Sequence, residues 1–370
     1  MMTNPQHLEN WLGDEKVAQL SDSMKDFYWP IAIQGVPGNV YAMPGGDFRG
    51  RILAGSEVSA IERGEQTLKK SNKARKLLTA IYRKQAGMAG FASLSDLISE
   101  ATTGKRREFA FSKAGATGVV GVTNSLWGLG NWPPAGANAA AAPAGESPTD
   151  ATTGAFPFDN PAGGDTSHFV YGAVASSTAH TLLLYDRLFQ VNTTMNSIAT
   201  EAVTGLPTRY QSTVATDANY IGGNFLFVEV GGTALAATAH NWTVCTYLDQ
   251  ANAASTLPSL TGNSGAIVRR LDHPAGQWFA PLESGDVGIK ALTQMQSSAA
   301  VATGVINFVI GHPIAFMPCL LANLVCITDG INTSFNLARV FDDAAMAFLE
   351  VTKPVTGGPN YVGSFTLVRG

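Results

Sequence analysis

Charged residues are scarce in this chain of 370 residues. Asp, Glu, Lys and Arg make up 14% of it, whereas a soluble globular domain contains about 25%. Hydrophobic residues reach 45%, which argues against a disordered chain. Low charge suits a protein whose surface is covered by further copies of itself, because interface cores are depleted in charged residues. β-rich secreted proteins share this composition, so the scarcity of charge alone does not distinguish the two classes.

Cysteines are few and widely spaced. Cys245, Cys319 and Cys326 are odd in number, and their spacing fits neither a disulfide framework nor a zinc site. We therefore expect buried free thiols in a protein made in a reducing cytoplasm. Residues 1–14 are polar and show no signal-peptide pattern, which agrees with that compartment.

Long uninterrupted hydrophobic runs are also missing. The most apolar stretch, Val301–Thr328, is broken by Gly311, Pro313 and Pro318. A helix needs about 20 continuous apolar residues to cross a bilayer. We expect this stretch to form buried strands joined by a turn, and we expect no membrane partner.

No motif for catalysis, cofactor binding or metal binding is present. The 6 histidines lack metal-ligand spacing. The sequence of Thr261–Ala266 lacks the G-x-S-x-G spacing of a nucleophile elbow and predicts a tight turn. Asp342 and Asp343 fall on an expected helix, where adjacent side chains do not face each other. His273 follows Asp272, and adjacent side chains of a strand point to opposite faces. We therefore expect no enzyme activity, no metal and no cofactor.

Positive charge is concentrated in one part of the chain. Residues 49–113 hold 14 Lys and Arg against 6 Asp and Glu, a net charge of +8, and the other residues hold 10 against 22, a net charge of −12. Such segregation is typical of proteins that meet a polyanion, a membrane surface or an acidic neighbour. Within this segment, Ser56–Ala86 predicts a long helix, with Ser59 and Glu62 as a capping box.

Bases share one side of that helix and continue beyond a second helix predicted over Ser93–Ala101. The members of this basic face are Lys69, Lys73, Lys76, Arg83, Lys84, Lys105, Arg106 and Arg107. Three interpretations stay open: non-specific contact with nucleic-acid phosphates, contact with an acidic surface of a neighbouring subunit, or a solvated face paired with nearby glutamates. No known nucleic-acid-binding module is recognisable, which argues against a sequence-specific DNA reader.

Local amino-acid composition divides the chain into five parts. We expect an N-terminal arm over 1–29, a Gly- and Pro-rich extended loop or hairpin over 30–55, the basic helical segment over 56–113, a Gly/Pro/Ala-rich loop or insertion over 114–165, and a β-rich body over 166–370. In the insertion, Asn131–Pro161 predicts a long surface loop.

Short runs of β-branched and aromatic residues predict strands in the body, including 225–230, 242–247, 305–310 and 365–368. Two further helices are predicted over 194–203 and 338–349. The expected fold class is therefore α+β. Trp127, Trp132 and Trp278 are isolated in sequence, which favours packing in a core or an interface over a sugar-stacking platform.

This order of arm, extended loop, long helix and α+β body resembles the major capsid proteins of tailed bacteriophages, which have the Hong Kong 97-like fold. The resemblance covers the whole chain in outline and rests on organisation, without a signature residue. It implies an arm over Met1–Trp29, an extended loop over Pro30–Gly55 and a long spine helix over Ser56–Ala86. The remainder would form β-rich peripheral and axial domains.

The resemblance implies a viral structural protein that self-assembles in the host cytoplasm, through hexamers and pentamers, into an icosahedral head enclosing double-stranded DNA. Its expected partners are further copies, decoration or scaffolding proteins, and packaged DNA in non-specific contact. Two alternatives stay open. One is another virion component: a decoration, tail-tube or jelly-roll capsid protein. The other is a β-rich carbohydrate-binding or hydrolytic protein, which would need a carboxylate pair in a cleft.

Overall fold

The computed structural model of the protein describes residues 90–91, 93–162, 164–211, 223–331, 337–352 and 358–370. The chain divides into two compact units, Met1–Ile98 and Ser99–Gly370. In the first unit, only residues 90–91 and 93–98 are described. The expected arm, extended loop and spine helix, which occupy residues 1–86, therefore lie outside the described residues.

Helix α6, Leu94–Thr102, forms where a short helix was predicted. The Ser93 hydroxyl accepts a hydrogen bond from the backbone N–H of Asp96 at 3.1 Å, which caps the first turn. Gly104 follows the helix with φ of +91°, a conformation that favours glycine. The helix predicted over Ser93–Ala101 is thus confirmed.

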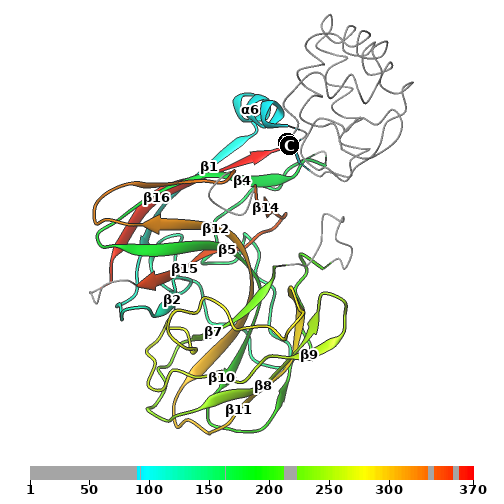
Figure 1. Ribbon diagram of the computed structural model, residues 1–370, viewed down its shortest axis with the longest axis vertical. Helices are drawn as coiled ribbons and strands as arrows, with labels where there is room; N and C mark the ends of the chain where they lie inside the picture. The colour runs from blue at the N-terminus through cyan, green and yellow to red at the C-terminus, as the bar shows by residue number, and fades with distance from the viewer. Residues whose placement is uncertain (1–89, 92, 163, 212–222, 332–336, 353–357) are drawn as a thin grey trace, which may run out of the picture. The chain divides into compact units, whose positions relative to one another are not determined.

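The described residues of the second unit form three antiparallel sheets (Figure 1). Sheet A has the order β13-β4-β16-β1-β3, with β14 also paired to β4. Its strands are β1 Arg106–Ala114, β3 Asn131–Trp132, β4 Ser167–Ser176, β13 Cys326–Asp329, β14 Arg339–Val340 and β16 Asn360–Arg369. Sheet B has the order β2-β15-β5-β12-β7. Its strands are β2 Thr123–Ser125, β5 His180–Thr194, β7 Phe225–Val230, β12 Val305–Cys319 and β15 Met346–Thr352.

Sheet C is the third sheet, with the order β10-β8-β11-β6 and β9 paired to β8. Its strands are β6 Glu201–Ala202, β8 Asn241–Asp249, β9 Ala254–Thr256, β10 Leu260–Thr261 and β11 Ile289–Ser297. In Figure 1, β8, β10 and β11 lie at the opposite end of β5 and β12 from β1, β4 and β16.

Strands β5 and β12 connect the three sheets. Each has 15 residues, and they pair from Val305 opposite Thr194 to Cys319 opposite His180. One core cluster joins sheet A to one half of this pair; its members include Phe111, Phe169, Leu184, Ile314, Phe348 and Phe365. A second cluster joins sheet C to the other half; its members include Leu188, Val228, Trp242, Tyr247, Met295 and Phe308. Two sandwiches therefore share these long strands.

The expected α+β, Hong Kong 97-like fold is wrong. The described ranges contain sixteen strands and a single helix of nine residues. The strands predicted over 225–230, 242–247, 305–310 and 365–368 are confirmed as β7 and as parts of β8, β12 and β16.

Two predicted helices are strands or irregular chain instead. In the range 194–203, β5 ends at Thr194 and β6 pairs with β11. In the range 338–349, β14 pairs with β4, and β15 is inserted between β2 and β5. Neighbouring strands supply backbone hydrogen bonds at these positions, and this tertiary pairing outweighs a weak local helix preference.

The segment Asn131–Pro161 is mostly irregular, as predicted, but it is not confined to the surface. Phe156 and Phe158 are buried between sheets A and B. The ring of Phe156 contacts Phe348 and Phe365 edge-on, with centroids 5.6 and 5.0 Å apart. This segment therefore supplies part of the core.

Candidate assembly surface

The connection between β12 and β13 exposes four large apolar side chains. Strand β12 is buried up to Cys319, and the chain then leaves the sheet for residues 320–325. Leu320, Leu321, Leu324 and Val325 are 60%, 61%, 52% and 58% exposed. Exposed leucines are common singly, but four in six residues form a local apolar surface.

Backbone hydrogen bonds anchor this loop to its neighbours. The N–H of Asn323 donates to the carbonyl oxygen of Ser176, at the end of β4, at 2.7 Å. The N–H of Leu320 donates to the Cys326 Sγ at 3.3 Å. Asn323 has φ of +57°, a left-handed conformation in which asparagine is several-fold enriched. The exposed side chains are thus carried by a backbone of defined shape.

The outward face of sheet A continues the apolar surface of the loop. Ile327 on β13 and Val362 on β16 are 63% and 58% exposed. Their strand neighbours on this face are small: Ala110, Ser112, Ala173, Ala175 and Ser364. We call Leu320, Leu321, Leu324, Val325, Ile327 and Val362 the apolar patch. The loop joins the sheet face at Ser176, which directly follows the strand partner of Val362.

The apolar patch lies on a charge-poor part of the surface, with the half-buried carboxylate of Asp329 at its edge, two residues after Ile327 on the same face of β13. Residues 301–328 contain no Asp, Glu, Lys or Arg. On the same face of sheet A, Arg106 and Glu108 form an exposed ion pair at 2.6 Å and neutralise each other. An apolar, charge-poor surface of this kind is complementary to a second apolar surface.

Three members of the predicted basic face are described, and each has a local partner. Lys105 forms ion pairs with Glu100 at 3.0 Å and Asp165 at 2.8 Å. Arg107 donates to the carbonyl oxygen of Gly104 at 2.9 Å, whereas Arg106 pairs with Glu108. Adjacent residues of β1 alternate, so Arg106 and Arg107 lie on opposite faces of sheet A. The other members, Lys69, Lys73, Lys76, Arg83 and Lys84, lie outside the described residues.

Lys113, the last base of the positive segment, is buried. Its ammonium group donates to the carbonyl oxygens of Leu129 and Pro133, at 2.7 Å in both cases. Burial, together with the nearby charge of Arg269, lowers the pKa of Lys113 to about 8. This lysine therefore ties the irregular segment after β2 to β1 and is not available to a polyanion.

Buried carboxylates of sheet B are engaged in ion pairs. Glu229 receives two hydrogen bonds from Arg187, at 2.6 and 3.3 Å, and both side chains are fully buried. Burial opposes ionisation of Glu229, but the charge and hydrogen bonds of Arg187 outweigh it, so its pKa is lowered. Asp186 is bound in the same bidentate way by Arg209. These carboxylates stabilise the interior and do not face a cleft.

His240 and Asp272 form a buried dyad beside the turn Thr261–Ala266. The Nε2 of His240 lies 2.9 Å from a carboxylate oxygen of Asp272, and its Nδ1 lies 3.0 Å from the carbonyl oxygen of Thr238. Both ring nitrogens of the imidazole are therefore engaged by oxygen atoms; burial lowers the pKa of His240, but the hydrogen bond and charge of Asp272 outweigh it and raise the pKa. The imidazole has no free nitrogen to accept a proton from a nucleophile, which excludes the triad arrangement. The predicted tight turn is confirmed by a hydrogen bond from Ala266 N–H to Asn263 O.

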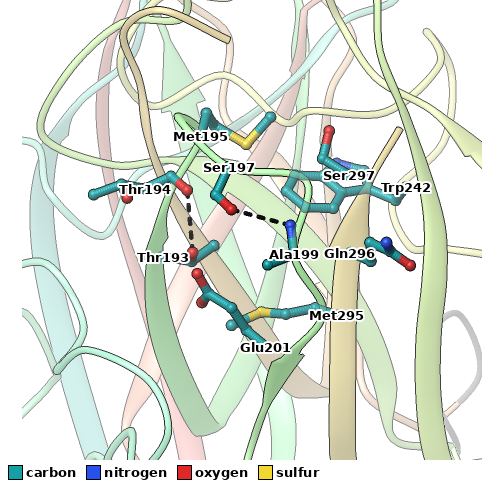
Figure 2. Close-up of a pocket in the computed structure, with 10 residues that line it drawn as sticks. All are labelled: Thr193, Thr194, Met195, Ser197, Ala199, Glu201, Trp242, Met295, Gln296 and Ser297. Atoms are coloured by element: carbon teal, nitrogen blue, oxygen red, sulfur yellow. Dashed lines mark hydrogen bonds between the residues drawn. The ribbon is translucent and has the colours of Figure 1, made fainter. Parts of the chain in front are cut away.

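A shallow pocket lies beyond the end of β5, against β8 and β11 (Figure 2). Met195, Trp242 and Met295 line it, and Glu201 is the one carboxylate among its lining side chains. Its cavity volume of about 10 Å³ is at the lower limit for one water molecule. Glycoside hydrolysis needs two carboxylates around a sugar. The pocket therefore gives no support to the carbohydrate-binding or hydrolytic alternative.

The predicted core tryptophans and thiols fall in different environments. Trp127 is buried, Trp278 packs against Phe316 at 5.6 Å between ring centroids, and Trp132 is half exposed at the edge of sheet A. Cys245 and Cys319 are buried free thiols as predicted, whereas Cys326 is half-buried.

Within the part of the chain that the structure describes, no three His, Cys, Asp or Glu side chains gather closely enough to hold a metal ion. No helix in the same ranges is long and apolar enough to cross a membrane.

Sequence reasoning missed the apolar patch because it assigned Val301–Thr328 to the core. Asn323, a polar residue inside the apolar run, was the available signal that the chain turns at the surface there.

Comparison with known proteins gives no family. No protein-family model matches the chain, and no curated protein matches it. One solved structure is weakly similar, a chain of the "Structure of infectious bursal disease virus Gt strain". It shares 9% sequence identity over 72% of this chain and 81% of that chain, with a TM-score of 0.13. Similarity this low carries no argument about fold, and function has to be argued from the surface itself.

Proposed function

We propose that the protein is a structural subunit that assembles with further copies of itself through the apolar patch. The observation that carries this proposal is the exposure of six large apolar side chains on one charge-poor surface. Monomeric soluble proteins rarely expose contiguous apolar surface of this kind, and such surfaces mark interaction sites.

A second copy of the chain is the occupant that the surface favours. Patches of the same composition are complementary to each other when neither carries charge. The whole chain is poor in charge, which agrees with surfaces that are covered by other copies. Edge strand β13 adds one exposed strand edge beside the patch, and exposed edges promote pairing between chains.

The assembly that we propose is a virion shell or another virion part. The charge-poor composition supports a shell, and the bases of residues 49–84 would offer charge to packaged nucleic acid. The subunit would build this shell from three antiparallel sheets, without the Hong Kong 97-like architecture. Contacts between copies, rather than a reaction, would then be its function.

Sedimentation velocity over a concentration range of roughly 1 to 100 µM tests the proposal, because affinities in this range appear as concentration-dependent size. We expect association that survives added sodium chloride and strengthens with sulfate, since apolar contacts are not screened by salt. Electron microscopy of the associated fraction should show regular particles. A monomer under all these conditions would overturn the proposal. So would binding to phosphatidylcholine vesicles without self-association.

A further inference from the structure

Glu350 is fully buried at the end of the molecule that carries the apolar patch. It lies near the end of β15, opposite Leu182 of β5. The same end of the sheets holds the end of β12 at Cys319, the end of β4 at Ser176 and the start of β16. The loop 320–325 begins directly after Cys319, so Glu350 and the patch belong to one end of the sandwich.

The Glu350 carboxylate links four segments through three hydrogen bonds. Its Oε1 accepts from the backbone N–H of Ala116 at 2.8 Å and from the Asn124 side chain at 3.2 Å. Its Oε2 accepts from the Tyr361 hydroxyl at 2.7 Å. These donors come from the loop after β1, from β2 in sheet B and from β16 in sheet A. A Cβ at Gly115 would come within 2.8 Å of Oε2, so the loop can approach only as glycine.

Within the described ranges, which leave out residues 353–357, an ionised Glu350 has no cationic partner. Among the described residues, none forms an ion pair with it. The ionisable groups on the elements around it are Tyr361 of β16, His180 of β5, Cys319 of β12, Lys113 of β1, and Arg270, which is bridged to Asn124. The Lys113 ammonium is bound by the carbonyl oxygens of Leu129 and Pro133. Burial raises the pKa of Glu350 to about 7, although its three hydrogen bonds lower it.

A short chain of contacts joins Glu350 to the patch. Tyr361 pairs with Ser176 and is hydrogen-bonded to the Ser176 side chain. The Ser176 carbonyl oxygen accepts the N–H of Asn323 in the exposed loop. Val362, which follows Tyr361 on β16, is itself a patch residue.

Building on the proposed function, we infer that Glu350 is a proton-operated clamp that controls whether the apolar patch is held in its assembling form. The protonated carboxyl keeps every partner: Oε1 accepts from Ala116 and Asn124, Oε2–H donates to Tyr361, and the tyrosine proton turns to Ser176. The ionised carboxylate is an uncompensated buried charge. Water that enters between the Gly115–Ala116 loop and β16 hydrates the ionised carboxylate. This entry loosens the contacts from Tyr361 through Ser176 to the loop 320–325 that hold the patch in place.

Assembly should therefore weaken as pH rises through about 7. The protonated, closed fraction falls from about nine-tenths to about one-tenth between pH 6 and pH 8, when the midpoint is near 7. Apparent affinity scales with the competent fraction, so association should weaken about tenfold over this interval.

Four full-length proteins test the clamp: the wild type, Glu350→Gln, Tyr361→Phe and the control Glu146→Gln. Glu146 is also a hydrogen-bonded carboxylate, bound by Gln190 outside sheet A. Sedimentation velocity and hydrogen exchange of residues 115–125 and 320–327 are measured from pH 6 to pH 8. Glutamine mimics the protonated acid, so Glu350→Gln should associate with equal affinity at pH 6 and at pH 8. Tyr361→Phe removes a donor to the carboxylate and should move the midpoint to higher pH. Glu146→Gln should behave as the wild type does.

The outcomes separate the clamp from the proposed function. If the wild type associates with equal strength at pH 6 and pH 8, the clamp is overturned and self-assembly stands. If Glu350→Gln keeps the wild-type pH dependence, another group is the sensor and the inference fails. If Glu350→Gln does not fold, Tyr361→Phe decides the test: a pH midpoint of association that is unchanged or lower than in the wild type would overturn the inference. If the wild type never associates, the proposed function fails, and pH-independent exchange of residues 115–125 would then reject the clamp separately.

Discussion

Replacing Leu321 and Leu324 by serine should weaken assembly while leaving the fold intact. Full burial of a leucine side chain stabilises a protein by about 1.5–3 kcal/mol. These two side chains are still 61% and 52% exposed, so covering each with a second copy should contribute roughly 1–2 kcal/mol. The double variant should therefore lose about 2–4 kcal/mol of association free energy per patch, which weakens the contact roughly 30- to 700-fold.

The assay is sedimentation velocity beside thermal unfolding of the same samples. Substitutions at exposed positions usually change the unfolding free energy by no more than about 0.5 kcal/mol, so the melting temperature should stay close to that of the wild type. Ile198→Ser with Leu206→Ser is the matched control, since these side chains are 55% and 53% exposed outside sheet A. Equal association of the patch variant and the wild type would refute the reasoning. Equal weakening by the control pair would show that general surface hydrophobicity, not the patch, drives association.

Three further predictions concern the interior. Glu350→Gln should flatten the pH dependence of the unfolding free energy. In the wild type, the folded-state pKa of Glu350, about 7, lies above its unfolded-state value, so the unfolding free energy should fall by roughly 3 kcal/mol between about pH 4.5 and pH 7. Urea unfolding of both proteins at several pH values checks this. For His240, burial lowers the pKa but the hydrogen bond and charge of Asp272 outweigh it, so the pKa is raised. The stabilisation of the fold by the His240–Asp272 pair is complete below about pH 6.5 and is lost as pH rises through the folded-state pKa of His240. An NMR titration of His240 should show the raised pKa, and unfolding of His240→Gln at several pH values should show the loss of stability. Glu229→Ala should cost about 3–5 kcal/mol, since it leaves the buried Arg187 charge unpaired, whereas the double change Arg187→Met with Glu229→Leu should cost less, as measured by chemical unfolding.

Several strands were predictable because their sequences carry the pattern of buried sheet. Phe225–Val230 and Val305–Ile310 are apolar except for Glu229 and Asn307, and both segments lie in sheet B. The α6 start was predictable for a local reason: the Ser93 hydroxyl needs only Asp96, three residues away, to form its cap. In each case, the determining contacts are local or follow directly from burial.

Other elements depended on partners that are distant in sequence. Phe341, Ala345 and Phe348 have the spacing of a helix face, and Met346 and Phe348 have that of a strand face. The deciding contacts come from β2 and β5, more than 150 residues earlier. Asp343 has φ of +57° and bonds to Asn160, so the expected helix cannot continue through it. No local pattern indicates such long-range pairs, which explains why the helix over 338–349 and the α+β class were wrong.

The apolar run Val301–Thr328 shows why the candidate surface itself could not be predicted. One half of the run forms β12, most of whose residues are buried between sheets, and the next six residues include Leu320 and Leu321, the two most exposed leucines among the described residues. Hydrophobicity records only that a side chain avoids water. It does not distinguish a side chain covered within its own chain from one that is covered by a second copy. If the patch is buried on assembly, the run is apolar throughout for one physical reason, and its exposed half belongs to a core that forms only between subunits.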